Sequence, residues 1–145
     1  MKLQTQVVVS KTPGKPISYQ SKVLMMGSCF VEHIGDKLDF YHFQVLQNPF
    51  GIIFHPEAFF LIIERALSNQ LFTIDDVFES DRGVWSSYCA HSNLNQLNPD
   101  ALLDVLNSKL SALKTSIQEG THMVFSYGTA WGYRLKSSHQ LVANC

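Results

Sequence analysis

The sequence has little that would suit it to a nucleic acid or a membrane. Lysine and arginine number 11 against 12 acidic residues, for a formal net charge of −1, so no basic face is expected for nucleic acid and no polybasic patch for a membrane surface. The longest apolar run, residues 58–63, is too short to cross a bilayer. The first six residues contain no apolar segment of signal-peptide type. These absences favour a soluble, cytoplasmic protein.

Cysteine is also scarce. Cys29, Cys89 and Cys145 are an odd number without close pairing, which argues for a reducing compartment rather than a disulfide scaffold. No histidines, cysteines or carboxylates have metal-ligand spacing, so we expect no metal and no cofactor. What the chain does have is hydrophobic residues, 46% of its 145 positions. That is enough for a real core, and we expect one domain over residues 1–145.

Apolar periodicity and helix breakers predict an α/β domain. We expect strands at 22–26, 43–46 and 123–127, helices at 30–38, 56–67 and 99–117, an edge strand at 3–9, and a hairpin from 133–135 and 141–143. Residues 73–95 fit no element and are long for a loop, which suggests an active-site segment or short elements. Their carboxylates, Asp75, Asp76 and Asp81, are interpreted as solvated loop charges. The order of elements is typical of three layers around a mainly parallel sheet.

The most informative motif is Gly27-Ser28-Cys29, directly after the apolar run at 23–26. A buried strand here ends in glycine and delivers a hydroxyl and then a thiol to the start of a helix. Ligands bind at the carboxyl ends of strands in open α/β sheets, so Ser28 is a candidate nucleophile. Spacing alone favours a simpler interpretation of Ser28 as a helix N-cap. Cys29 is an alternative nucleophile, because helix N-termini favour reactive thiolates; otherwise it is a small buried residue.

Glycine follows each of the three expected central strands, as Gly27, Gly51 and Gly128. Glycine at a strand end permits tight turning and close approach of the backbone to a ligand. Because parallel strands end at one edge of their sheet, the three glycines together suggest a common site.

Several ordered motifs resemble the GSCFA-domain family. They are Met26-Gly27-Ser28-Cys29-Phe30-Val31 with Ile34-Gly35, Asn48-Pro49-Phe50-Gly51, Trp85-Ser86-Ser87 with His91-Ser92, Tyr127-Gly128-Thr129-Ala130-Trp131 with Tyr133-Arg134-Leu135, and Val142-Ala143-Asn144-Cys145. Val31 stands where that family usually has alanine. The family in turn resembles the SGNH, or GDSL-like, hydrolase superfamily. This resemblance implies a flavodoxin-like three-layer α/β/α fold and an esterase or acyltransferase with Ser28 as its nucleophile.

The resemblance also implies roles for other residues. Gly51 matches the superfamily's oxyanion-hole glycine, and Gly128-Thr129 lies where a Gly-x-Asn motif is usual. No asparagine stands there, so Thr129 would donate through its hydroxyl or its backbone N–H. His91 would line the site, bind substrate or act as a base; a hydrogen-bonded loop histidine is the alternative. Asn144 would be a further substrate-binding residue.

In the superfamily the Asp-His pair of the triad follows the last strand, and the 145 residues contain no such motif after Val142. On this resemblance the chain looks like the N-terminal half of a longer domain. Two functions stay open. The first is a serine esterase or acyltransferase acting on an acylated small molecule or polysaccharide. The second is a non-catalytic binding module or inactive fragment that self-associates across an uncovered sheet edge. Neither involves nucleic acid or membrane.

Overall fold

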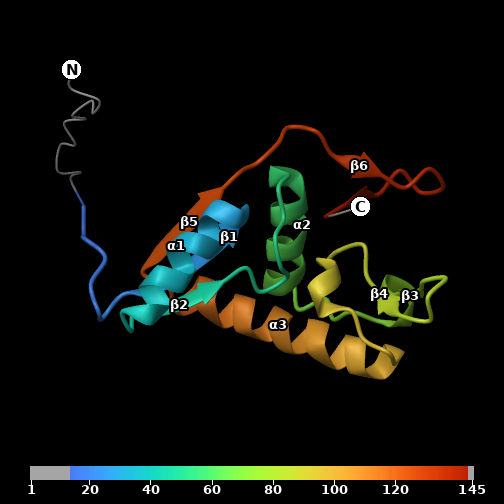
Figure 1. Ribbon diagram of the computed structural model, residues 1–145, viewed down its shortest axis with the longest axis horizontal. Helices are drawn as coiled ribbons and strands as arrows, with labels where there is room; N and C mark the ends of the chain where they lie inside the picture. Colours follow the sequence, from blue (N-terminus) through green and yellow to red (C-terminus); the bar gives the residue numbers. More distant parts are fainter. Residues whose placement is uncertain (1–13, 144–145) are drawn as a thin grey trace, which may run out of the picture.

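The centre of the fold is a three-stranded parallel sheet in the order β2-β1-β5 (Figure 1). A computed structural model describes residues 14–143, so the expected strand at 3–9 and the site residue Asn144 lie outside the described part. The strands are β1 (Lys22–Gly27), β2 (Gln44–Gln47) and β5 (His122–Ser126). Val23 of β1 lies opposite Val45 and His122 in parallel register, so the carboxyl ends of all three strands share one edge. The predicted parallel sheet is confirmed.

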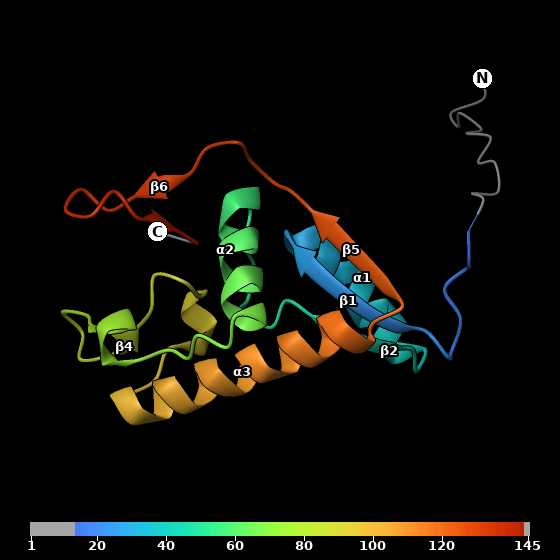
Figure 2. The same ribbon diagram turned by 180° about the vertical axis from the view of Figure 1, so that it is seen from behind.

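Helices cover both faces of this sheet. Helix α1 (Cys29–Phe40) lies in front of it in Figure 1 and behind it in Figure 2, while α2 (Pro56–Leu67) and α3 (Pro99–Glu119) belong to the other side. Successive side chains of a strand point to opposite faces. Val23 and Met25 therefore pack with α1, and Leu24 and Met26 join the larger core under α2 and α3. A strand covered on both faces needs a continuous apolar run, as this one has.

The helix starts follow the capping residues in the sequence. The Ser28 Oγ accepts a hydrogen bond from the Phe30 N–H (3.4 Å) at the start of α1. Asn98 Oδ1 does the same for Asp100 (2.7 Å) and Ala101 (3.3 Å) at the start of α3. The predicted cap at Ser28 is confirmed, and α1 ends two residues beyond its predicted end. Helix α3 ends at Glu119, directly before the helix breaker Gly120.

Residues 73–95 contain the short elements that the sequence left unassigned. They are the 3₁₀ turns η1 (Ile74–Asp76) and η2 (Ser92–Leu94), with the antiparallel pair β3 (Phe78–Glu79) and β4 (Trp85–Ser86) between them. The expected C-terminal hairpin is present as β6 (Tyr133–Arg134) and β7 (Leu141–Val142). Among the described residues, no helix is both long and apolar enough to span a membrane.

The expectation that all three central strands end in glycine is wrong for two of them. Strand β2 ends at Gln47 and β5 at Ser126, so only β1 ends in a glycine, Gly27. Asn48, with φ +37°, turns the chain out of the sheet directly after β2. After β5, the Gly128 N–H donates to the Phe54 carbonyl (3.0 Å), which draws the chain away from β1. Gly51 and Gly128 therefore lie in loops beyond the sheet edge.

Candidate functional site

Gly27 and Asn48 fix the turn that presents Ser28. Gly27 has φ +155°, and a Cβ on it would lie 2.9 Å from the Ser126 Cβ, so glycine is required where β1 passes β5. The Gly27 N–H donates to Asn48 Oδ1 (2.7 Å), which ties the end of β1 to the loop after β2. The Asn48 N–H donates in turn to the Met25 carbonyl (2.8 Å). These contacts give Ser28 one defined position at the carboxyl edge of the sheet.

The hydroxyl of Ser28 is half-buried and contacts a second hydroxyl. Its Oγ lies 2.9 Å from Ser126 Oγ, where either atom can donate, and it also accepts the long bond from the Phe30 N–H. Within residues 14–143 no histidine is hydrogen-bonded to it. The capping role predicted for Ser28 is confirmed, and its role as nucleophile stays a prediction.

The backbone N–H groups of Ser28 and of Gly51, the expected oxyanion residue, already have acceptors within the chain. The Ser28 N–H donates to the Ser126 carbonyl (3.2 Å), and the Gly51 N–H donates to the Asn48 carbonyl (2.8 Å). An oxyanion would have to compete with both carbonyls, whereas an effective hole presents preorganised donors. The oxyanion role of Gly51 stays a prediction. It requires the Gly51 N–H to leave the Asn48 carbonyl and donate to the oxyanion instead.

After β5, Thr129 offers a hydroxyl in addition to the backbone N–H groups of Gly128 and Thr129. The N–H groups of Gly128 and Thr129 both point to the Phe54 carbonyl, at 3.0 and 3.4 Å. The Thr129 Oγ accepts a hydrogen bond from the Trp131 N–H (3.0 Å). A hydroxyl has one donor besides its acceptor lone pairs, so the proton of Thr129 stays available for a ligand. The hydroxyl rather than the backbone N–H of Thr129 is therefore the group suited to recognition.

The structure brings the motifs at 48–51 and 91–92 together. Gly51 has φ +76°, and a Cβ on it would lie 3.1 Å from His91 Cγ and 2.8 Å from Asn93 Oδ1. The His91 N–H donates to the Phe50 carbonyl (2.9 Å) across the same contact. Glycine is thus needed at position 51 to let the η2 segment pack on the loop after β2.

His91 is a hydrogen-bonded loop histidine that also lines a cavity. Its Nδ1 accepts a hydrogen bond from the Asn93 N–H (3.2 Å) and caps η2. His55 repeats the arrangement, since its Nδ1 accepts from the Glu57 N–H (3.2 Å) and caps α2. A neutral imidazole whose Nδ1 accepts carries its proton on Nε2. Both histidines therefore present an Nε2–H donor, a state that suits ligand binding better than proton abstraction.

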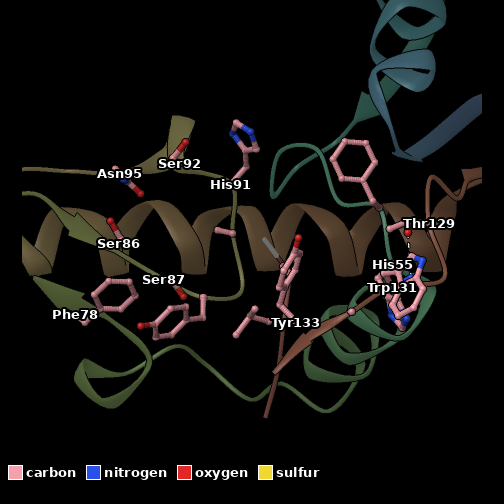
Figure 3. A pocket seen from close by; sticks show the side chains of 16 residues that line it. His55, Phe78, Ser86, Ser87, His91, Ser92, Asn95, Thr129, Trp131 and Tyr133 are labelled. Atoms are coloured by element: carbon pink, nitrogen blue, oxygen red, sulfur yellow. Dashed lines mark hydrogen bonds between the residues drawn. The ribbon is translucent and has the colours of Figure 1, made fainter. Parts of the chain in front are cut away.

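A cavity of about 580 Å³ lies beside these residues, within the range of small-molecule sites. Three parts of the chain line it: the start of α2, the segment 78–95 and the hairpin region 129–143 (Figure 3). His91 and Thr129 are among its lining residues, whereas Ser28, Gly51 and Gly128 are not. The site residues expected from the sequence thus fall into two neighbouring groups, one at the Ser28 turn and one at the cavity.

Sequence reasoning missed the aromatic wall of this cavity. Its rings come from all three parts of the chain: Phe54, Phe78, Tyr88, Trp131 and Tyr133. Phe78 and Tyr88 stack with their ring centroids 4.3 Å apart. Because these residues share no sequence spacing, only Trp131 and Tyr133 carried a signal, as members of the motifs that resemble the GSCFA-domain family.

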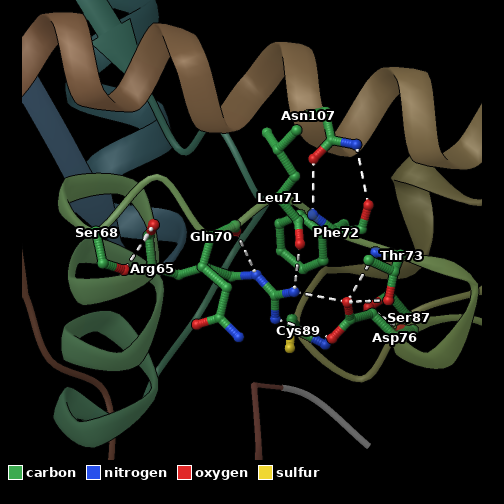
Figure 4. A network of polar contacts seen from close by, with 10 residues as sticks. All are labelled: Arg65, Ser68, Gln70, Leu71, Phe72, Thr73, Asp76, Ser87, Cys89 and Asn107. Atoms are coloured by element: carbon green, nitrogen blue, oxygen red, sulfur yellow. Dashed lines mark hydrogen bonds and ion pairs between the residues drawn. The ribbon is translucent and has the colours of Figure 1, made fainter.

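The Arg65 network, made of Arg65, Asp76, Ser87, Cys89 and the carbonyls of 70 and 71, is drawn in Figure 4 and adjoins the cavity through Ser87. The Arg65 guanidinium binds both carboxylate oxygens of Asp76, at 2.9 and 2.6 Å, and donates to the carbonyls of Gln70 and Leu71, both at 2.9 Å. Its carbon Cζ lies 4.0 Å from the Phe72 ring centroid. The expectation that Asp76 is a solvated loop charge is wrong, because Arg65 reaches it from α2.

Charges and burial in this network shift two pKa values. Burial alone would raise the pKa of Asp76, but hydrogen bonds from Arg65 and Thr73 outweigh burial and hold that pKa below its usual value. Burial raises the pKa of the Cys89 thiol. Ser87, which lines the cavity, donates to the Asp76 carbonyl (2.9 Å) and accepts from the Cys89 N–H (3.3 Å). The network therefore fixes one wall of the cavity.

Cys29 is exposed at the start of α1, so the interpretation of this residue as a small buried side chain is wrong. Its neighbour Val31, where alanine is usual, is completely buried between α1 and the sheet. No group of three or more potential metal ligands lies together among the residues described.

A family model described as the GSCFA family matches residues 22–145, which include every motif on which the resemblance was based. Comparisons with curated proteins and with solved structures gave no match.

Proposed function

We propose that this chain, which belongs to the GSCFA family, carries the nucleophile of a serine esterase or acyltransferase of SGNH type. The position of Ser28 carries the proposal. Its half-buried hydroxyl lies at the carboxyl end of the central strand β1, at the start of α1. Ligands of parallel α/β sheets bind at this edge, where helix N-termini favour developing negative charge.

The sheet order supports a flavodoxin-like assignment. A flavodoxin-like sheet has the order 2-1-3-4-5, and β2-β1-β5 corresponds to its first three positions, with the strands parallel throughout. Helix α1 covers one face, and α2 and α3 contribute to the core on the other. This is the arrangement that the superfamily resemblance implies for a first-strand serine nucleophile.

The reaction would proceed through an acyl-enzyme. Ser28 Oγ forms a bond to the acyl carbon and loses its proton to a base, and the alcohol leaves with a proton. Water or an acceptor alcohol then takes the acyl group and restores the Ser28 hydroxyl. Ser126 Oγ, 2.9 Å away, can hold the Ser28 hydroxyl in place but is a weak base. We propose that the base is supplied from outside residues 14–143, as the resemblance implies.

Hydrolysis of p-nitrophenyl acetate tests this function, because its p-nitrophenolate leaving group departs without a proton and so needs no general acid. We expect release of p-nitrophenolate above the rate of buffer alone, and its loss in Ser28→Ala. Ser126→Ala is the matched control, since it removes the neighbouring hydroxyl and leaves the nucleophile. Equal rates in wild type and Ser28→Ala would contradict the proposal.

A non-catalytic binding module is the second candidate. Two observations favour it: the cavity does not include Ser28, and the expected backbone oxyanion donors are hydrogen-bonded within the chain. Such a module could also self-associate, because β5 pairs only with β1 in the described part of the chain and its Met123 is 45% exposed. Ligand binding in the cavity without any acylation of Ser28 would favour this candidate.

A further inference from the structure

We propose that the cavity binds a neutral sugar ring. The step that makes this sugar the alcohol part of the ester cleaved at Ser28 rests on the proposed function; the binding itself does not. The inference follows from three properties of the lining residues, which are their lack of Asp, Glu, Lys and Arg, their exposed aromatic rings and their supply of hydroxyl and N–H groups.

The described lining of the cavity has two histidines, His55 and His91, as its basic side chains. None of the described residues that line it is Asp, Glu, Lys or Arg. Two charged residues adjacent in sequence to lining residues, Glu57 and Arg134, are paired with each other at 3.0 and 3.1 Å. A charged ligand would lose water in this cavity without gaining a partner of opposite charge, which is costly. Phosphates, carboxylates and cations are therefore disfavoured, and a neutral ligand is favoured.

Aromatic rings are unusually exposed around the cavity. Trp131 is 85% exposed and Tyr133 61%, although both are large side chains that proteins normally keep covered. They lie on the hairpin side, and Phe78 lies across the cavity from them (Figure 3). Such flat apolar surfaces next to polar groups suit a ligand that has an apolar face and a polar edge. The C–H face and hydroxyl edge of a pyranose have this character.

The polar lining groups match hydroxyl groups. Ser86, Ser92, Asn95 and the Thr129 hydroxyl can each donate and accept, and His91 presents an Nε2–H because its Nδ1 is used as a cap. Sugar hydroxyls also both donate and accept. A fatty acyl chain would instead cover these groups without bonding them, and leaving polar groups covered and unpaired is unfavourable. The lining therefore favours a sugar over an acyl chain.

The two tryptophans of the chain provide the test. Trp131 lines the cavity, whereas Trp85 packs against the core and its backbone pairs with Gln96. The Ser28→Ala variant is titrated with a panel of neutral oligosaccharides (cellobiose, xylobiose, chitobiose, maltotriose), with digalacturonate as an anion and with hexanoate as an acyl chain. Tryptophan emission and calorimetry report binding, and Ser28→Ala prevents turnover.

We expect a saturable blue shift with at least one neutral sugar, which persists in Trp85→Phe. Trp131→Ala should weaken calorimetric binding about tenfold or more, because it removes the largest ring of the wall. Phe40→Ala is the matched control: it removes a ring of comparable exposure on α1, outside the cavity, and should leave binding unchanged.

Absence of binding to every neutral sugar, or tighter binding of digalacturonate or hexanoate, would overturn the inference. So would equal losses in Trp131→Ala and Phe40→Ala. The result is separable from the proposed function. Sugar binding without Ser28-dependent esterase activity would contradict the proposed function and support the sugar site. Ser28-dependent activity without sugar binding would support the proposed function and contradict the sugar site.

Discussion

The Arg65 network and the Ser28 turn are both polar clusters, the first adjoining the cavity and the second outside its lining, and their hydrogen bonding differs. The Arg65 guanidinium donates to a carboxylate and two carbonyls at 2.6–2.9 Å. The Ser28 hydroxyl has a second hydroxyl at 2.9 Å and one N–H at 3.4 Å. The Arg65 network thus contains an ion pair with short hydrogen bonds. The Ser28 hydroxyl makes only neutral hydrogen bonds, one of which is long.

This difference in hydrogen bonding indicates that the Arg65 network has a structural role and that the Ser28 hydroxyl is free to take part in a reaction. A buried charge is retained where its partners satisfy it, and it then fixes the surrounding chain. A hydroxyl with weak, exchangeable partners at a sheet edge can give up those partners to a substrate. We therefore expect substitutions in the Arg65 network to affect stability most and substitutions at the Ser28 turn to affect catalysis most.

The largest expected effect is on stability at Arg65. Arg65→Ala leaves the partly buried Asp76 without its ion pair and should lower the free energy of unfolding by about 3 kcal/mol, measured by urea denaturation. Arg65→Lys keeps the charge but loses the two-pronged contact, so its loss should be intermediate. If Arg65→Ala lowered the free energy of unfolding no more than Ser28→Ala does, the expected difference in stability between the two clusters would be contradicted.

The stabilising effect of Asp76 should depend on pH. Its pKa is lowered in the folded state from the ordinary value of 3.8. A carboxyl with a lowered folded-state pKa stabilises the fold above its unfolded pKa, and the stabilisation is lost as pH falls through the folded value. The stability gap between wild type and Asp76→Asn should be constant from pH 7 to about 5 and narrow below about 4. A gap that widens on acidification would contradict the ion pair.

The two described thiols should react at different rates. Cys29 is exposed, whereas Cys89 is half-buried beside Arg65 and burial raises the pKa of its thiol, so less thiolate is present at a given pH. In a Cys145→Ser background, DTNB should modify Cys29 about tenfold or more faster than Cys89. The variants Cys29→Ser and Cys89→Ser assign the two phases; similar rates would mean that the Arg65 network opens readily.

The smallest expected effect is on stability at Ser28. Ser28→Ala removes the N-cap of α1 and should cost about 1 kcal/mol. Ser28→Asp keeps a capping oxygen and should cost less, although it has no nucleophilic hydroxyl. Thermal denaturation of the two variants checks the cap. A decrease of several kcal/mol in the free energy of unfolding of both variants would mean that Ser28 is needed mainly for the fold.

Local sequence signals were sufficient for the sheet and helices but not for the segment between α2 and α3. The apolar run before Gly27 and the caps Ser28 and Asn98 define their elements within a few residues. The strands β3 and β4 have only two residues each, too few for any periodicity, and β4 is held by the distant partner Gln96. Long-range contacts decide such elements.

The same limit applies to the site. Ser28, His91 and Thr129 were identifiable because each belongs to a recognisable motif. Most of the aromatic wall was not, since Phe54, Phe78 and Tyr88 belong to no motif and come together only in the folded chain. Asp76 was misjudged for the same reason: its partner Arg65 lies on α2, before the turn that brings the two together.

The most direct test of the central claim is the rate at which a fluorophosphonate labels Ser28, read by intact mass and peptide mapping. The pair Ser28→Asp and Ser126→Ala separates the nucleophile from its neighbour, because Ser28→Asp preserves the helix cap. We predict one adduct, on Ser28, that is absent in Ser28→Asp and persists in Ser126→Ala. An adduct on Ser126 or another hydroxyl, with Ser28 unlabelled, would contradict it.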